Sequence, residues 1–267
     1  PPPFITSTLQ QEAFRKLRFT ARRTMVVAQQ LYEGIGLGDE GSAGLITYMR
    51  TDSTNVSSSA LSEAVGYIKE AFGPNYAPKS VRRYTKKAKG AQEAHEAIRP
   101  TSIRHDPESM RRHLSSEQSR LYELIWRRML ASQMADARSE STTVDIDASC
   151  KGSSVVYLFR ATGSVLVFPG FRTLYLESRD DEDDGQGRQA LPPLVKGNGL
   201  GCEKLDTVQH FTQPPPKFTE ATLIKMMEER GIGRPSTYAP TIGTLTDRNY
   251  VEKERNRLTP TTLGTTI

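Results

Sequence analysis

The chain has 267 residues, with 36 Lys and Arg against 31 Asp and Glu and a formal net charge of +5. Its composition, 36% hydrophobic and 25% charged with 20 Gly and 16 Pro, is that of a globular protein and excludes a fibrous, collagenous or wholly disordered chain. The longest apolar runs, such as 165–168, are far shorter than the roughly 20 residues of a transmembrane helix, so we expect no membrane partner.

The two cysteines, Cys150 and Cys202, have neither a CxxC pair nor a neighbouring histidine. This usage gives no support for a disulfide scaffold or a zinc site and favours a reducing, cytoplasmic setting. The first residues lack the basic and apolar regions of a signal peptide. We expect the chain to be an internal segment of a longer protein.

Two helices and a strand are predicted at the start of the chain. Apolar spacing indicates a helix over 8–17, a turn at 18–20 and a second helix over 21–33 that ends at two glycines. An extended segment over 44–50 follows. The order helix, tight turn, helix, strand is the outline of a winged helix-turn-helix.

Three further helices complete a mostly helical region. One begins in the serines at 57–59 and has an amphipathic stripe of Leu61, Val65, Ile68 and Phe72. The others are predicted over 91–98, before Pro100, and over 116–134. Between them, the basic run from Lys79 to Lys89 contains no acidic residue, which is as compatible with a polyanion contact as with a solvated loop.

The hydrophobic period then changes to two, which predicts a small antiparallel sheet. Its expected strands cover 141–148, 153–161, 164–170 and 205–211. The acidic segment 180–189 interrupts the sheet, but it lacks the spacing of an EF-hand and is interpreted as a solvated loop. Neither a Walker lysine nor a GxGxxG motif follows a strand, so we expect no nucleotide cofactor.

The helical period returns near the end of the chain. Helices are predicted from Thr219 to about Gly231 and again from Arg234, before a charged hairpin over 250–258. This repeats the helix, turn, helix, wing order of residues 8–50. A repeated outline of this kind favours nucleic-acid binding.

Tyr48 and Arg50 are the first candidates for chemistry. In an extended backbone their side chains point to the same face. A guanidinium beside a phenol stabilises the phenolate and can bind a phosphate through two hydrogen bonds, so the pair could hold and attack a phosphodiester. From spacing alone, a plain surface pair is the commoner meaning of Tyr-x-Arg.

Two other groups could bind phosphate. On a helix over 91–98, His95 and Arg99 would lie one turn apart, with Glu93 and Glu96 either orienting them or remaining surface carboxylates. Pro235 is expected near the first position of a helix, with Ser236 and Thr237 in its first turn and Arg234 just before it. Ordinary helix capping is the alternative for this second group.

Three motifs carry a resemblance to a known family. ITYMRTDSTN at 46–55, AQEAHEAIRPT at 91–101 and RGIGRPSTYAPTIGTLTDRNYV at 230–251 resemble, in order, the tyrosine segment, the histidine helix and the later helix-turn-helix of type IA DNA topoisomerases. The Tyr-Met-Arg form is similar to that of the bacterial topoisomerase I branch. The similarity spans nearly the whole chain.

The resemblance implies a multidomain α+β fold with winged-helix-like units. Its expected domains are a β-rich arch over 1–7 and 138–212, a helical domain with the tyrosine over 8–137, and part of a winged-helix-like base domain over 213–267. It implies ATP-independent relaxation of negative supercoils by cutting one strand through a 5′-phosphotyrosine link. The partner is DNA, preferentially single-stranded, bound by a monomer in the bacterial nucleoid.

The resemblance also implies the roles of individual residues. Tyr48 would be the nucleophile, Arg50 would stabilise the scissile phosphate, and His95 would lie in the same pocket. The expected DNA contacts are Thr51, Asp52, Ser53, Arg99, Arg234, Ser236, Thr237 and Arg248. The family's Mg²⁺ is bound by a Toprim domain, for which this sequence has no counterpart, so we expect no metal ligand here and little relaxation by the chain alone.

Two other functions compete with this interpretation. A transcription regulator would explain the helix-turn-helix outlines and the basic run, but it would leave Tyr48, Arg50 and His95 without a role. A tyrosine recombinase also uses Tyr, Arg and His. Its tyrosine follows the Arg and His-x-x-Arg motifs, whereas Tyr48 precedes His95 here.

Overall fold

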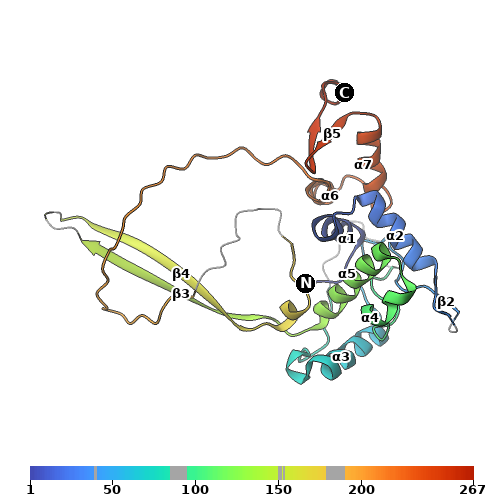
Figure 1. The fold of residues 1–267 in the computed structure, drawn as a ribbon, viewed down its shortest axis with the longest axis horizontal. Helices are drawn as coiled ribbons and strands as arrows, with labels where there is room; N and C mark the ends of the chain where they lie inside the picture. The colour runs from blue at the N-terminus through green and yellow to red at the C-terminus, as the bar shows by residue number, and fades with distance from the viewer. Residues whose placement is uncertain (39–40, 85–94, 150–151, 153, 179–189) are drawn as a thin grey trace. The chain divides into compact units, whose positions relative to one another are not determined.

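The computed structural model describes residues 1–38, 41–84, 95–149, 152, 154–178 and 190–267. They form two compact units (Figure 1). The helical unit comprises Pro1–Asp136, Gly170–Asp180 and Lys217–Ile267, and the β unit comprises Ala137–Pro169 and Asp181–Pro216. The fold class is confirmed, because helices are combined with small antiparallel sheets.

The N-terminal helical pair of the helical unit is confirmed. Its elements are α1 (Thr6–Glu12), a π-helical turn (Ala13–Leu17), α2 (Ala21–Glu33) and the short paired strands β1 (Ile35–Gly36) and β2 (Ser42–Ala43). Helix α1 starts slightly before the predicted residue 8, because the hydroxyl of Thr8 accepts a hydrogen bond from the N–H of Ile5 at 3.0 Å. Helix α2 is capped by Thr20 and ends at Gly34, whose φ of 133° suits glycine.

The other helices of this part surround the main core. They are α3 (Ser58–Phe72), α4 (Pro107–Met110) and α5 (Ser116–Gln133), with 3₁₀ turns at Pro74–Tyr76, Arg111–His113 and Gly170–Thr173. Helices α3 and α5 begin and end where the sequence predicted. Ser57 caps α3, and Ser115 with Gln118 forms a capping box at α5. The core is dominated by large apolar side chains that are almost fully buried: Phe4, Leu9, Leu31, Leu45, Ile46, Ile68, Ile98, Leu121, Ile125 and Leu130.

The predicted helix over 91–98 is wrong for the residues that the structure describes, 95–98; residues 91–94 lie outside them. This segment is extended and pairs with residues that are distant in the chain. Ala97 donates to the carbonyl of Asn55 at 2.7 Å and Ile98 to that of Phe4 at 2.8 Å, and Pro100 forms a bridge with Ile46. Long-range pairing therefore overrides the local helix propensity of the Ala- and Glu-rich sequence.

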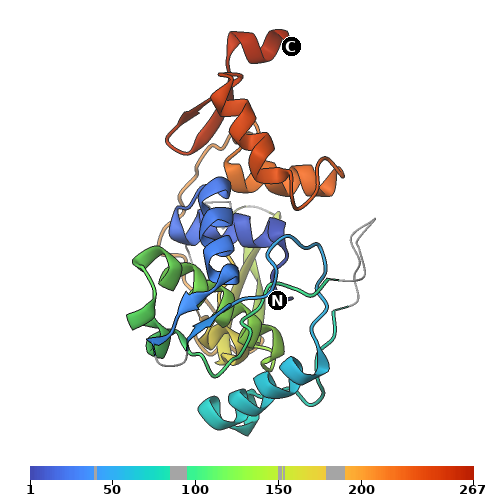
Figure 2. The same cartoon turned by 90° about the vertical axis from the view of Figure 1, so that its right-hand side faces the viewer.

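The end of the chain forms a second small core (Figure 2). Its elements are α6 (Glu220–Glu229), α7 (Tyr238–Asp247), the hairpin β5 (Val251–Glu254) and β6 (Arg257–Pro260), and α8 (Thr262–Thr266). The helix-turn-helix and the hairpin are confirmed, and α8 is an addition. Ala21, at the start of α2, completes the core of these helices. The buried residues of this core are Ala21, Ile224, Met227, Tyr238, Ala239 and Ile242.

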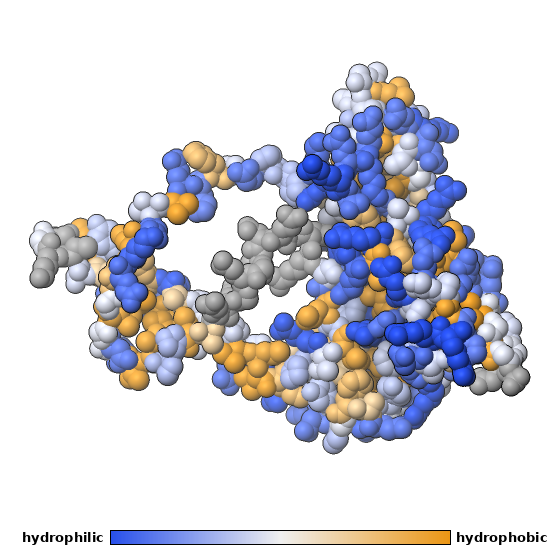
Figure 3. All heavy atoms as spheres, viewed as in Figure 1, coloured by the Kyte–Doolittle hydropathy of each residue, from blue (hydrophilic) through white to orange (hydrophobic). Residues whose placement is uncertain are grey.

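The β unit is built on one hairpin, in which β3 (Arg138–Ser149) pairs antiparallel with β4 (Val156–Phe168). The sequence predicted two strands where β4 is continuous, because Gly163 pairs with Thr142 without breaking the ladder. The predicted strand over 205–211 is wrong: this segment is exposed, and no described strand pairs with it. Many apolar side chains of β4, such as Val156 and Leu158, are also exposed (Figure 3).

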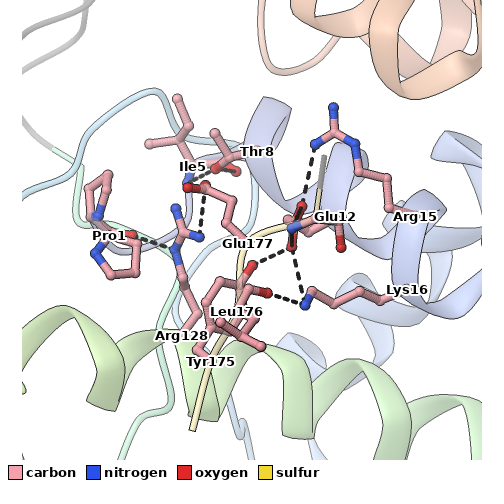
Figure 4. A network of polar contacts seen from close by, with 12 residues as sticks. Pro1, Ile5, Thr8, Glu12, Arg15, Lys16, Arg128, Tyr175, Leu176 and Glu177 are labelled. Carbon is pink, nitrogen blue, oxygen red and sulfur yellow. Dashed lines mark hydrogen bonds and ion pairs between the residues drawn. The ribbon is translucent and has the colours of Figure 1, made fainter. Parts of the chain in front are cut away.

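A buried arginine holds Tyr175 and Glu177 against the rest of the helical unit (Figure 4). Arg128 of α5 is 1% exposed, donates to the carbonyl of Pro2 at 2.6 Å and pairs with Glu177 at 3.1 Å. Its guanidinium lies over the rings of Phe4 and Tyr175, at 4.9 and 4.8 Å from their centroids.

The phenol of Tyr175 donates to buried Glu12 on α1 at 2.5 Å. Burial raises the pKa of Tyr175; the charge of Arg128 opposes this effect and the charge of Glu12 adds to it. Residues 1–7, which we expected in the arch domain, lie in the helical unit, where Phe4 is fully buried. The three-domain division itself stays a prediction.

Candidate active site

Tyr48 and Arg50 emerge from a buried, extended segment. Leu45, Ile46 and Met49 are at most 1% exposed, whereas Tyr48 is 39% exposed and Arg50 is also exposed. The buried residues anchor the segment in the main core, and the bridge between Ile46 and Pro100 holds it next to the segment 95–100. Tyr48 and Arg50 line the same cavity, as the extended-chain spacing predicted.

The ring of Tyr48 is packed between two other rings. The edge of Tyr32, on the last turn of α2, meets it at 5.4 Å between centroids with an interplanar angle of 67°. The ring of His95 lies 6.1 Å away, tilted by 37°. The structure therefore brings His95 next to Tyr48, from an extended segment rather than from a helix, although His95 does not line the cavity that Tyr48 shares with Arg50.

Gly44 allows the segment that leads to Tyr48 to approach α2 closely. A Cβ at residue 44 would lie 2.5 Å from the carbonyl oxygen of Tyr32, which no side chain tolerates. The next residue, Leu45, donates its N–H to the carbonyl of Leu31 at 2.8 Å. These backbone contacts fix the position of Tyr32 against Tyr48.

Thr47 ties the nucleophile candidate to the histidine segment. Its N–H donates to the carbonyl of Arg99 at 2.9 Å, and its hydroxyl donates to that of Ala97 at 2.6 Å and accepts from the N–H of Arg99 at 3.0 Å. The residue next to Tyr48 is thus held against the segment 97–99 by both its backbone and its side chain. Sequence reasoning did not single out Thr47, and its place beside Tyr48 in the motif was the only signal.

A cavity of about 850 Å³ lies in front of Tyr48 and Arg50, between α2 and α7. Its walls are mixed, with apolar side chains, two amides and both signs of charge. The lining residues are Arg22, Met25, Val26, Gln29, Gln30, Tyr48, Arg50, Pro235, Ser236, Ala239, Pro240, Gly243, Thr244 and Asp247. Arginine side chains beside apolar surface suit a nucleic-acid strand, which offers phosphates and base faces together.

The residues after Arg50 shape the backbone. Thr51 is 1% exposed and its hydroxyl accepts from the N–H of Ser53 at 3.0 Å, while the hydroxyl of Ser53 accepts from Asn55. Their predicted DNA contacts stay predictions, and the burial of Thr51 and Ser53 favours a structural role. Asp52 is half-buried.

Asp52 belongs to an acidic neighbourhood at α6 and α7. Burial raises the pKa of Glu228; a hydrogen bond with Ser7 opposes this effect, and the charges of Glu229 and Asp52 add to it. Burial also raises the pKa of Tyr238, with the charges of Glu228 and Asp52 adding to the effect and Arg234 opposing it. Glu228 therefore carries a carboxyl group whose charged form is disfavoured in the folded protein.

Arg99 does not form the predicted clamp with His95. The two are not one helical turn apart, because the segment is extended. The guanidinium of Arg99 pairs with Glu96 at 2.6 Å and donates to the carbonyl of Pro100 at 2.9 Å, and Glu96 also accepts from the N–H of Ser57 at 2.6 Å. Glu96 thus orients Arg99 within the fold, and a DNA contact of Arg99 stays a prediction.

The segment of Arg234 differs in detail from the expectation. Helix α7 begins at Tyr238, so Pro235 lies in a turn before the helix rather than at its first position. The turn is closed by the hydroxyl of Thr237, which accepts from the N–H of Arg234 at 2.7 Å. Ser236 lines the cavity and Arg234 is exposed.

Arg248 is exposed at the C-terminal end of α7. Part of the basic run can also be described: Arg82 pairs with Asp136 at 2.8 Å and Arg83 donates to Ser58 at 3.0 Å. The rest of this run, from residue 85, lies outside the described residues. Among the described residues, no group of three or more His, Cys, Asp or Glu side chains could hold a metal ion.

Comparison with known proteins identifies the class. The family model of DNA topoisomerases matches residues 1–267, and the chain therefore belongs to this family. It is 53% identical over 269 aligned residues to DNA topoisomerase 1 of Xylella fastidiosa, from strain Temecula1 / ATCC 700964 and equally from strain 9a5c. The alignment covers all of this chain and 32% of either relative, so the chain spans about a third of their length.

The structure agrees with the sequence match. The crystal structure of full-length topoisomerase I from Thermotoga maritima superposes with a TM-score of 0.77 at 40% identity, covering 99% of this chain and 41% of that one. Each helix in the described part of the chain is too short or too polar to cross a membrane.

Proposed function

We propose that the chain carries the tyrosine-bearing part of a bacterial type IA DNA topoisomerase, which relaxes negative supercoils without ATP by cutting, passing and resealing one DNA strand. The observation that supports this most is the position of Tyr48. It is exposed at a cavity with Arg50, and its ring contacts the rings of Tyr32 and His95.

In the proposed step, Oη of Tyr48 attacks the phosphorus of a phosphodiester in single-stranded DNA. The bond between phosphorus and the 3′ oxygen breaks, the phenol loses its proton, and the 3′ oxygen gains one. The DNA is left with a free 3′ hydroxyl and a 5′ phosphate bound to Tyr48. Attack by that hydroxyl reverses the step, so the link conserves the energy of the phosphodiester and no ATP is needed.

Arg50 would stabilise the charge that develops on the phosphate, because a guanidinium can donate two hydrogen bonds to its oxygens. His95 would position the phosphate beside the tyrosine. Arg22 and Ser236, which line the cavity, and Arg234 nearby would contact the backbone of the strand. Such contacts follow phosphates rather than base sequence, which favours a flexible single strand.

The family resemblance calls for Mg²⁺ in a Toprim domain. The described residues of this chain do not fit a magnesium site, because no cluster of suitable ligands is found among them. We therefore route no step through the ion. We also propose that the chain by itself binds DNA, as a monomer in the bacterial cytoplasm, and gives little relaxation.

The test is formation of a covalent adduct. The chain is mixed with a separately produced Toprim-containing segment of a topoisomerase relative, Mg²⁺ and labelled single-stranded DNA, then denatured. We expect a labelled protein band, lost in Tyr48→Phe, which keeps the ring packing and removes the hydroxyl. Tyr32→Phe, which removes the neighbouring hydroxyl, should keep the band. His95→Ala should reduce it less than Arg50→Ala does.

A further inference from the structure

Glu220 is a buried carboxylate that joins three elements of the helical unit. It is the first residue of α6 and is 5% exposed. Its Oε2 accepts from the N–H of Ala21 at 2.8 Å, and its Oε1 lies 2.9 Å from Nζ of Lys253 on β5. Because Ala21 is the first residue of α2, one side chain ties α6 and β5 to the start of α2.

The two contacts use different oxygens of the same carboxylate. The first N–H groups of a helix have no partner within it and carry partial positive charge, so a carboxylate is the acceptor that suits them best. The charge of Glu220 is compensated by Lys253, whose ammonium also lies 5.4 Å from the ring centroid of Phe14. Removal of the carboxylate would leave the buried N–H of Ala21 without an acceptor and would break the ion pair with Lys253, which is partly exposed to solvent.

The contact lies where α6 and α7 pack on α2. Ala21 shares a core with Ile242 of α7, and Met25, one turn further along α2, is partly buried against the same core. Met25 and Ala239 also line the cavity in front of Tyr48. The distance between α2 and α7 at this junction therefore sets the width of the cavity.

We propose that Glu220 is a positioning residue of the cleavage site, which holds α7 at the distance from α2 that lets one DNA strand lie against Tyr48 and Arg50. Glu220 touches neither of these residues and acts through the two helices. The identity of the ligand rests on the proposed function, whereas the spacing is a property of the free protein. The two can therefore be tested separately.

The spacing is measured first, without DNA. Spin labels are attached at Gln29→Cys and Thr244→Cys, on opposite walls of the cavity, in a chain whose Cys150 and Cys202 are replaced by serine. Pulsed electron–electron double resonance should give a longer and broader distribution of label-to-label distances in Glu220→Ala than in the parent. Glu220→Gln should keep the parent distribution, because its amide oxygen still accepts from Ala21.

Glu63 provides the matched control. Its carboxylate also accepts from a backbone N–H, that of Ile103 at 3.2 Å, and from the hydroxyl of Ser102 at 2.7 Å. It lies on α3 and does not line the cavity. Glu63→Ala should lower the melting temperature without changing the distance. If Glu220→Ala does not fold, Glu220→Asp, with the same charge and one methylene less, must still shift the distribution.

Binding is measured second, by fluorescence anisotropy with a labelled single-stranded oligonucleotide and unlabelled protein. We expect Glu220→Ala to weaken binding by about tenfold, Glu220→Gln to restore most of the affinity, and Glu63→Ala to bind like the parent. An unchanged distance in Glu220→Ala, or an equal loss of binding in Glu63→Ala, would overturn the positioning role. A parent chain that does not bind single-stranded DNA would instead contradict the proposed function.

Discussion

The ring of Tyr48 lies 6.1 Å from that of His95, although the whole of α3 separates the two residues in the chain. Thr47 maintains this contact, because its hydroxyl is hydrogen-bonded to Ala97 and Arg99 and its N–H to the carbonyl of Arg99. A tyrosine, an arginine and a histidine are thus gathered at the surface of a rigid core. Side chains held in this way lose little conformational entropy when they meet a phosphate.

Arg50 is expected to act in the cleavage step more than in binding. Arg50→Ala should slow adduct formation by about 30-fold to 1,000-fold, since one contact to developing charge is worth roughly 2–4 kcal/mol in a transition state. Single-turnover cleavage with saturating oligonucleotide measures this rate. Arg22→Ala, which removes another arginine from the same cavity, should weaken DNA binding but leave the rate at which bound DNA is cleaved unchanged. Equal losses of the cleavage rate in both variants would contradict a specific role of Arg50 in the cleavage step.

Binding of DNA to the chain should depend on salt and on strandedness. Because the expected contacts are to phosphates, the affinity for single-stranded DNA should fall steeply between low and physiological salt and should exceed that for duplex. Titrations of both DNAs at two salt concentrations test this. Equal affinity for duplex, or one preferred duplex sequence, would favour a transcription regulator.

Arg128 should be essential for the stability of the helical unit. Arg128→Ala leaves the carbonyl of Pro2 without its donor and opens a cavity beside the rings of Phe4 and Tyr175, which should cost about 2–5 kcal/mol in the free energy of unfolding. Arg127→Ala, at the neighbouring exposed position paired with Glu123, should cost less than about 0.5 kcal/mol. Urea denaturation of both variants gives the comparison, and similar costs would show that the buried network is unimportant.

Glu228 should make stability depend on pH. Its pKa is raised in the folded state, mainly by burial and also by nearby acids. The protonated carboxyl therefore contributes to the free energy of unfolding, and this contribution is fully present below the ordinary pKa of a carboxyl group. That contribution is lost as the pH rises through the folded-state value. Glu228→Gln should therefore raise the melting temperature at pH 7 and have no such effect near pH 4.

Melting curves at the two pH values test the effect, with Glu229→Gln, at an exposed position of the same helix turn, as the control. A stabilisation of Glu228→Gln that is equal at both pH values would mean that the charge is not its cause.

The sequence predicted the elements whose signals are local. Helices α2, α3 and α5 have caps, apolar periodicity and clear ends within their own residues. The extended segment at 95–98 could not be predicted in this way, because its partners Phe4 and Asn55 are far away in the chain. The continuous strand β4 was missed because a glycine signals a break until its partner strand is known.

The residues of the candidate site also differ in how far local sequence rules could predict their positions. Tyr48 and Arg50 were predicted to share a face because alternation within an extended segment is a local rule. The pairing of Arg99 with Glu96 was one of two alternatives from the sequence, whereas the hydrogen bond that Glu96 accepts from the N–H of Ser57, at the start of α3, could not be predicted. Glu220 carries no motif at all, and its partner Ala21 is 199 residues away.

The most direct test of the central claim is to identify the residue that carries the DNA. The adduct formed in the reconstituted system with Mg²⁺ is trapped by denaturation, digested with nuclease and trypsin, and sequenced by tandem mass spectrometry. Trypsin should release residues 24–50 as one peptide, which contains both Tyr32 and Tyr48, so the fragment ions must separate the two. We predict a 5′-linked nucleotide on Tyr48 alone; a nucleotide on Tyr32, or on a peptide from another part of the chain, would contradict the assignment of Tyr48 as the nucleophile.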